Sequence, residues 1–113
     1  MRRHRVFILY ECPLFAEGVR RLLGSCRDLE VVGMEKDRAK AMAAVRGLQP
    51  DTLLVEGVAG ADELPAGVTE LVLDHVVGSV IGFSLARNSL TVLRRQRIEV
   101  NAVDDLVTAI TGA

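Results

Sequence analysis

Three short apolar runs in the first half of the chain predict buried β-strands. They comprise residues Val6–Tyr10, Leu29–Met34 and Thr52–Val55. Each run is rich in branched or aromatic side chains and carries little charge, which is typical of strands covered on both faces of a sheet. The third run ends at Glu56 and Gly57, where polar and turn-forming residues resume.

Between these runs, apolar residues recur at the spacing of a helix. One such stretch covers Leu14–Leu23 and follows Pro13, a residue suited to the first turn of a helix. A second covers Ala41–Leu48; Asp37 can cap its start, and Pro50 lies just beyond its end. Strands that alternate with helices through short connections predict right-handed βαβ units. The expected fold is therefore α/β and flavodoxin-like, with a parallel sheet and helices on both faces.

The second half of the chain is less regular. It predicts, in order, a helix over Val68–Val76, strands over Ser79–Leu85, Leu90–Leu93 and Ile98–Val100, and a helix over Val103–Thr111. Residues 87–89 form a turn signal, and Leu90–Leu93 is too short and too rich in β-formers to be a helix. Asn101 and Asp104 resemble a capping box before the last helix. We therefore expect an antiparallel β-meander where a fourth helix would ordinarily stand.

Composition narrows the class of protein. The chain has 113 residues, 26% of them charged, and a formal net charge of -1. This length suits one domain, and near-neutral charge argues against binding to nucleic acid or an anionic membrane. No apolar run approaches the roughly 20 residues that span a bilayer. Two cysteines at the ends of a predicted helix cannot pair, so we expect a cytoplasmic protein without disulfides.

Three segments carry a family resemblance. They are residues Val6–Val19, Leu29–Gly33 and Leu48–Glu56, which include a Pro-Leu-x-x-Glu-Gly step from Pro13 and a Gln-Pro-Asp step from Gln49. In these segments the chain resembles the receiver domain of bacterial two-component response regulators. The resemblance implies a role in signal transduction or a phosphorelay, with residues 1–113 as a single receiver-like domain that has no output domain.

The resemblance also implies where a receiver would keep its chemistry. The acidic pair that holds Mg²⁺ falls on Tyr10 and Glu11, the phosphoacceptor position on Glu56, and the switch hydroxyl on Ser84. The lysine after the fifth strand has no counterpart, because Glu99 stands near that position. Glu11 and Glu56 are weak candidates for a metal site, since Mg²⁺ binds through carboxylates and phosphate in a near-ideal octahedron.

These departures predict a pseudo-receiver that is not an enzyme. A glutamate at position 56 moves the nucleophilic oxygen by about 1.5 Å relative to an aspartate, and a misplacement near 1 Å can cost about a hundredfold in rate. We expect a phosphorylation-independent regulatory module without a cofactor, which contacts proteins such as a signalling kinase or regulator. Two alternatives stay open: an Mg²⁺-dependent phosphoacceptor that uses Glu56, Glu11 and Ser84, and a flavodoxin-like domain that binds a nucleotide or flavin.

Replacement of the fourth helix by a strand further predicts a homodimer. The expected uncovered apolar patch comprises Val80, Phe83, Leu85, Val92, Leu93 and Ile98. Such a patch is uncommon on a soluble monomer, and pairing about a two-fold axis would bury it. In the alternative, the last helix, Val103–Thr111, folds back over the patch and leaves a monomer.

Overall fold

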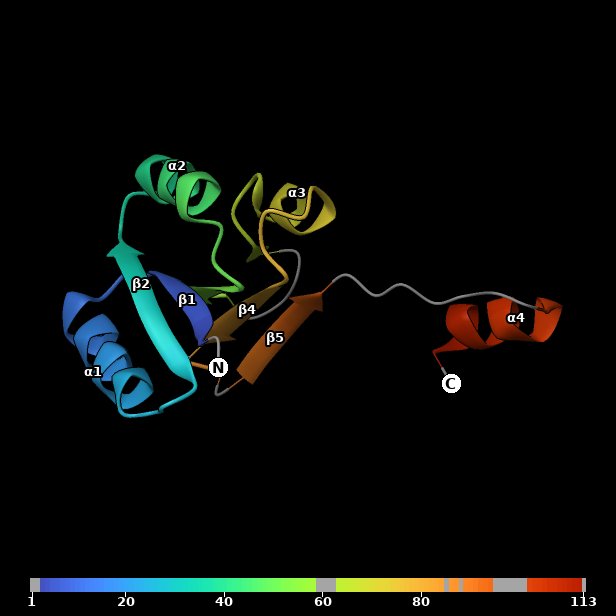
Figure 1. Ribbon diagram of the computed structural model, residues 1–113, viewed down its shortest axis with the longest axis horizontal. Helices are drawn as coiled ribbons and strands as arrows, with labels where there is room; N and C mark the ends of the chain where they lie inside the picture. The colour runs from blue at the N-terminus through green and yellow to red at the C-terminus, as the bar shows by residue number, and fades with distance from the viewer. Residues whose placement is uncertain (1–2, 59–62, 85, 88, 95–101, 113) are drawn as a thin grey trace.

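The computed structural model describes residues 3–58, 63–84, 86–87, 89–94 and 102–112 (Figure 1). Its elements, in chain order, are β1 (His4–Leu9), α1 (Pro13–Gly24), β2 (Leu29–Glu35), α2 (Arg38–Leu48), β3 (Thr52–Glu56), α3 (Val68–Leu73), β4 (Ser79–Ser84), β5 (Ser89–Arg94) and α4 (Val103–Thr111). The expected alternation of strands and helices over the first half is confirmed. No helix in these ranges is long and apolar enough to cross a membrane.

The strands form one five-stranded sheet in the order β2-β1-β3-β4-β5. The first four strands run parallel, and β5 pairs antiparallel with β4, with Ser84 opposite Ser89 and Ser79 opposite Arg94. The α/β class and an antiparallel strand in place of a helix after β4 are therefore confirmed. The further strand predicted over residues 98–100 lies outside the described residues.

Helices flank the sheet unevenly. Figure 1 shows α2 and α3 on one face and α1 on the other. The main core lies between the sheet and the α2–α3 layer, and its buried members are Phe7, Leu9, Ala41, Val45, Leu53, Val55, Val58, Val68, Leu71, Val72, Val77 and Val80. Alternate residues of the same strands, Ile8 among them, point to the α1 face, where Ala16 of α1 is also buried.

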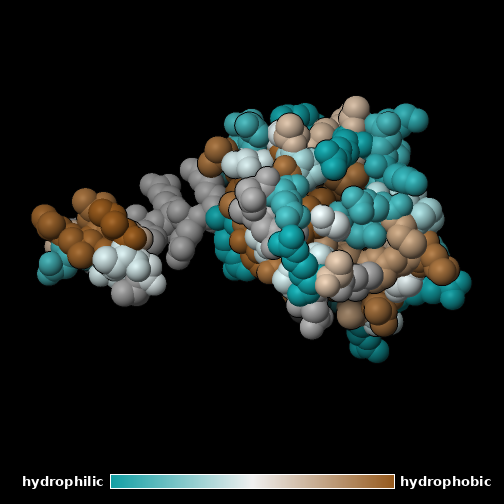
Figure 2. Space-filling view, turned by 180° about the vertical axis from the view of Figure 1, so that it is seen from behind, coloured by the Kyte–Doolittle hydropathy of each residue, from teal (hydrophilic) through white to brown (hydrophobic). Residues whose placement is uncertain are grey.

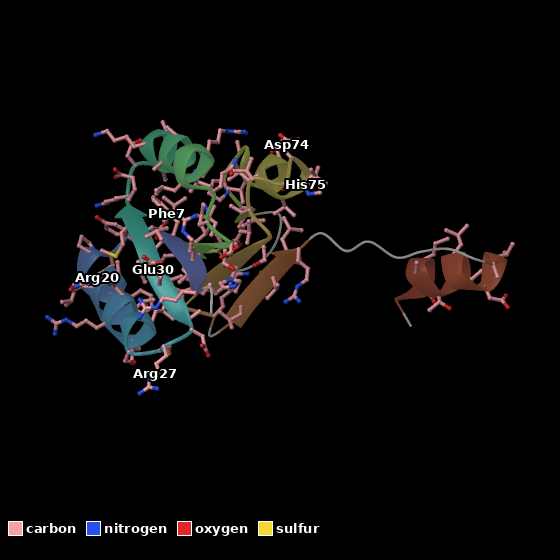
Figure 3. The ribbon with its side chains drawn as sticks, in the orientation of Figure 1. Phe7, Arg20, Arg27, Glu30, Asp74 and His75 are labelled. Atoms are coloured by element: carbon pink, nitrogen blue, oxygen red, sulfur yellow. The ribbon has the colours of Figure 1, made fainter. Side chains whose placement is uncertain are left out.

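A close contact fixes how β2 meets β1. The register between the two strands shifts between Val6 and Phe7, so that Phe7 lies opposite Gly33. A Cβ atom on Gly33 would lie 2.6 Å from the Phe7 ring, which Figure 3 shows close to β2. Glycine at position 33 therefore leaves room for an aromatic side chain in the core.

The third helix is shorter than its apolar spacing predicts. It ends at Leu73, and His75 follows with a positive φ of 60°. His75 is exposed beyond the end of α3 (Figure 3), so the predicted extent of this helix to Val76 is wrong. The chain turns there because Val76 and Val77 donate their amides to the carbonyl of Leu71, which ends the helix and returns the chain to the sheet.

The predicted apolar patch is not one surface. Val80 belongs to the core on the α3 side, and Leu93, opposite it on β5, packs against the same core. Phe83 instead contacts Phe15 of α1, with ring centroids 5.3 Å apart. Val92 lies on that second face, because neighbouring residues of a strand point to opposite faces. The other two residues of the predicted patch, Leu85 and Ile98, lie outside the described residues.

Candidate functional site

A small cavity lies at the carboxyl ends of β1 and β3. Its volume is about 50 Å³, and it is lined by Leu9, Tyr10, Glu11, Lys36, Arg38, Glu56, Gly57, Val58, Glu63 and Pro65. We call it the strand-end cavity. Three of the four positions taken from the receiver resemblance, Tyr10, Glu11 and Glu56, therefore come together, at the edge of a parallel sheet where ligands commonly bind.

The carboxylate of Glu56 is tied to the loop that leads into α1. Its Oε1 accepts hydrogen bonds from the backbone amides of Glu11, at 3.0 Å, and Cys12, at 3.1 Å. Cys12 is the N-cap residue of α1 and makes no side-chain cap of its own. A carboxylate so close to the start of a helix is favoured by the helix dipole, so Glu56 is positioned both by β3 and by α1.

The carboxylate of Glu11 lies over the turn that follows β3. Gly57 has a φ of 86°, and a Cβ atom there would lie 2.7–2.8 Å from the carboxyl atoms of Glu11. The amides of Gly57 and Val58 donate to the carbonyl of Phe83, at 2.8 and 3.1 Å, which fastens the turn to β4. Glycine is needed at position 57 for its conformation, and an added Cβ atom would force the end of the Glu11 side chain to move.

Two cations also line the strand-end cavity. They are Lys36 and Arg38, in the connection from β2 to α2 and at the first residue of that helix. The connection is held by carboxylates: Glu35 Oε2 accepts from the amides of Lys36 and Asp37, at 2.8 and 2.9 Å. Asp37 in turn caps α2 by accepting from the Lys40 amide at 2.9 Å, as the sequence predicted.

These residues do not fit a magnesium site. Tyr10 supplies a phenol where a receiver has a carboxylate, and Oε1 of Glu56 already accepts two amide hydrogens. Lys36 and Arg38 share the cavity lining with Glu11, Glu56 and Glu63, so cationic side chains compete with a divalent cation for the same carboxylates. Within the described ranges, no group of three or more His, Cys, Asp or Glu side chains could hold a metal ion.

Ser84 lies apart from this cavity. Its Oγ accepts a hydrogen bond from the Arg87 amide at 3.2 Å and so holds the turn between β4 and β5. Ser84 lines a different hollow, between α1 and the β4–β5 hairpin. The structure therefore does not bring the predicted switch hydroxyl into the lining of the strand-end cavity. Glu99, at the lysine position, lies outside the described residues.

A surface pair on α1 shifts the pKa of both its partners. Arg20 donates to Glu17 from both Nε, at 3.1 Å, and Nη2, and this holds the pKa of Glu17 below its ordinary value. The same hydrogen bonds raise the pKa of Arg20. Arg20 projects from α1 (Figure 3), so this pair belongs to the exposed side of the helix.

Sequence reasoning missed a polar cluster at the opposite end of the sheet. His4 Nε2 lies 2.7 Å from Thr52 Oγ1, which lies 2.9 Å from Ser79 Oγ, so that the first residues of β1, β3 and β4 are joined side chain to side chain. Thr52 is a buried polar residue. A threonine at the start of an otherwise apolar run was the available signal, because a buried hydroxyl needs a partner.

Comparison with known proteins leaves the family open. No protein-family model matches the chain, and no curated protein matches it.

Proposed function

We propose that this chain is a receiver-like regulatory module that works by protein–protein contact and without phosphorylation. Its partners would be other components of bacterial signal transduction, such as a kinase or a regulator. The proposal is supported by the order of the parallel strands, by the strand-end cavity, and by the residues at the positions where a receiver would carry its chemistry.

The bond between Glu56 and the α1 loop is the observation that carries this proposal. At the position of a phosphoacceptor, a carboxylate holds the amides of Glu11 and Cys12. A fixed negative charge at the end of β3 thus orders the β1–α1 loop without any modification. The surface that this loop presents is constant, which suits a module whose partner contact is not switched by phosphate.

Phosphoryl transfer to Glu56 is the competing function, and intact mass separates the two. The full chain is incubated with acetyl phosphate and Mg²⁺, with Glu56→Gln treated in parallel. We expect no gain of a phosphoryl group in either protein, because Oε1 of Glu56 is held by two amides and Tyr10 replaces one carboxylate of a receiver's metal site. A gain in the native chain that Glu56→Gln abolishes would overturn the proposal.

Thermal stability in Mg²⁺ gives a second test. A ligand at about 100 times its dissociation constant adds roughly 2.7 kcal/mol to the free energy of unfolding. A poorly fitted site should gain well under ~1 kcal/mol from low-millimolar Mg²⁺, which corresponds to a rise in melting temperature of less than about 4 °C. A larger rise that Na⁺ at equal ionic strength does not produce would contradict the proposed absence of receiver metal chemistry.

A further inference from the structure

An apolar groove is open on the α1 face of the sheet. Its hollow of about 450 Å³ is lined by Phe15, Val19, Leu54, Phe83, Ser84, Ser89 and Leu90. A neighbouring hollow along α1 shares Phe15 and Val19 and adds Leu14, Gly18, Arg21, Leu22 and Ser25. We call these two hollows together the α1–β5 groove. Leu90 on its wall is 70% exposed, so this part of the sheet has no cover in the described part of the chain.

Helix α4 carries an apolar face without a partner. Val103, Leu106, Val107 and Ile110 recur at i, i+3, i+4 and i+7 and therefore share one side of the helix. All four are exposed, and Figure 2 shows apolar side chains gathered along one side of α4. In Figure 1 the helix lies apart from the sheet, beyond β5. One chain thus holds both an open groove and an unpartnered helix.

Helix α4 is shorter than the strand that runs beside the groove. Nine residues of α-helix extend about 13.5 Å, and the six residues of β4 extend about 20 Å, so α4 can lie lengthwise beside the strand. Asp104 lies in the first turn of α4, and Arg21, whose side chain is 78% exposed, lines the groove with its Nε 3.6 Å from Glu17 Oε1. The acidic end of α4 would therefore meet an arginine that Glu17 already partly neutralises, so apolar contact rather than charge favours docking.

We propose that the occupant of the α1–β5 groove is α4 of a second copy of this chain, so that two copies exchange their last helices. Eight residues separate β5 from α4 and span up to about 26–29 Å, a tether long enough for exchange. Figure 1 shows α4 apart from the sheet, so its apolar face is available to the groove of a second copy. A two-fold exchange would bury both grooves and both helix faces.

This inference goes beyond the regulatory role, because it concerns another face of the sheet and does not depend on Glu56. The test uses the full chain and two charge-introducing variants at exposed sites: Leu90→Glu in the groove and Leu106→Glu on α4. Leu73→Glu is the matched control, since Leu73 is 62% exposed on α3, on the opposite face. Far-UV circular dichroism checks that each variant is folded.

Light scattering at micromolar concentration gives the first result. We expect a dimer for the native chain and for Leu73→Glu, and a dissociation constant at least about tenfold higher for Leu90→Glu and for Leu106→Glu, because each buries a charge in the contact. A native chain that stays monomeric, or a dimer that both variants leave intact, would overturn the proposal.

Mixing the two variants distinguishes exchange of α4 between two copies from docking of α4 on its own chain. In an exchanged dimer, the native groove of Leu106→Glu accepts the native helix of Leu90→Glu, and one of the two contacts is restored. We expect an affinity-tagged copy of one variant to retain the other at concentrations where each alone is monomeric. A mixture that stays monomeric overturns the exchange.

Discussion

A glutamate reaches one methylene further than an aspartate, and position 56 uses that reach. Oε1 of Glu56 bridges from β3 to the amides of Glu11 and Cys12, which lie 45 and 44 residues earlier in the chain. A charged acceptor shared by two amides forms stronger hydrogen bonds than a neutral one. The side chain that departs from a receiver's phosphoacceptor is therefore also a structural tie between two loops.

Removal of this carboxylate should loosen the α1 loop. We expect Glu56→Ala to lower the free energy of unfolding by about 1–3 kcal/mol, because two amides at the start of α1 lose a charged acceptor. Glu56→Gln keeps an oxygen at the same reach and should lose less than half as much. Urea denaturation of the native chain and the two variants measures their order of stability. Equal stability of Glu56→Ala and the native chain would show that water replaces the carboxylate at no cost.

Gly57 should tolerate no side chain. Its φ of 86° opposes alanine, and an added Cβ atom would also displace the carboxylate of Glu11, whose atoms would lie 2.7–2.8 Å away. We expect Gly57→Ala to lower the free energy of unfolding by more than about 1 kcal/mol. Gly47 in α2 is the control: no atom lies within 4 Å of a Cβ there, and Gly47→Ala should stabilise by about 0.5–1 kcal/mol. Chemical denaturation compares the two. Equal effects would contradict the role given to Gly57.

The sequence predicted correctly that some of these residues lie together, but it did not predict their hydrogen bonds, and the difference has a physical reason. Tyr10, Glu11 and Glu56 were expected together because the receiver resemblance puts them at the carboxyl ends of neighbouring parallel strands. The hydrogen bonds that Glu56 makes could not be expected, since they depend on where a loop 45 residues away comes to lie. The contacts of His4 with Thr52 were missed because both residues look unremarkable until β1 and β3 are paired.

At the scale of elements, the spacing of apolar residues predicted whether a segment is a helix or a strand better than it predicted where the element ends. Helix α1 matches its apolar spacing almost residue for residue, whereas α3 stops at Leu73 although the spacing continues to Val76. There the chain returns to the core through hydrogen bonds to Leu71 that a helical pattern does not encode. The predicted apolar patch failed for another reason: it combined Val92 and Leu93, which a strand must place on opposite faces.

The start of α2 offers a test of one element alone. Asp37 accepts from the Lys40 amide and is the N-cap that the sequence predicted. We expect Asp37→Ala to lower the free energy of unfolding by about 0.5–2 kcal/mol, and Asp37→Asn, which can still cap, to leave it nearly unchanged. Thermal or chemical unfolding distinguishes them. If both variants lose the same free energy of unfolding, the negative charge of Asp37 rather than its capping hydrogen bond stabilises α2.

At the scale of the whole molecule, the two faces of the sheet are unequal. Helices α2 and α3 lie over one face of the sheet (Figure 1) and complete a core there. The α1–β5 groove is open on the other face. The same chain carries α4 with four exposed apolar side chains. Burial of apolar surface is the main force that folds and joins proteins, so groove and helix together favour association.

Hydrogen exchange along α4 should therefore depend on protein concentration. An isolated helix shorter than about 12–15 residues is marginal in water, and α4 has nine residues, with no basic side chain in its last turn. Its amides should exchange nearly freely in dilute solution and become protected once exchanged dimers form, whereas Ile8, fully buried in β1, should be protected at every concentration. Leu106→Glu should remove the protection of α4 and leave that of β1. Protection of α4 that is equal at low and high concentration would mean that the helix docks within its own chain, because only contact with a second copy follows mass action.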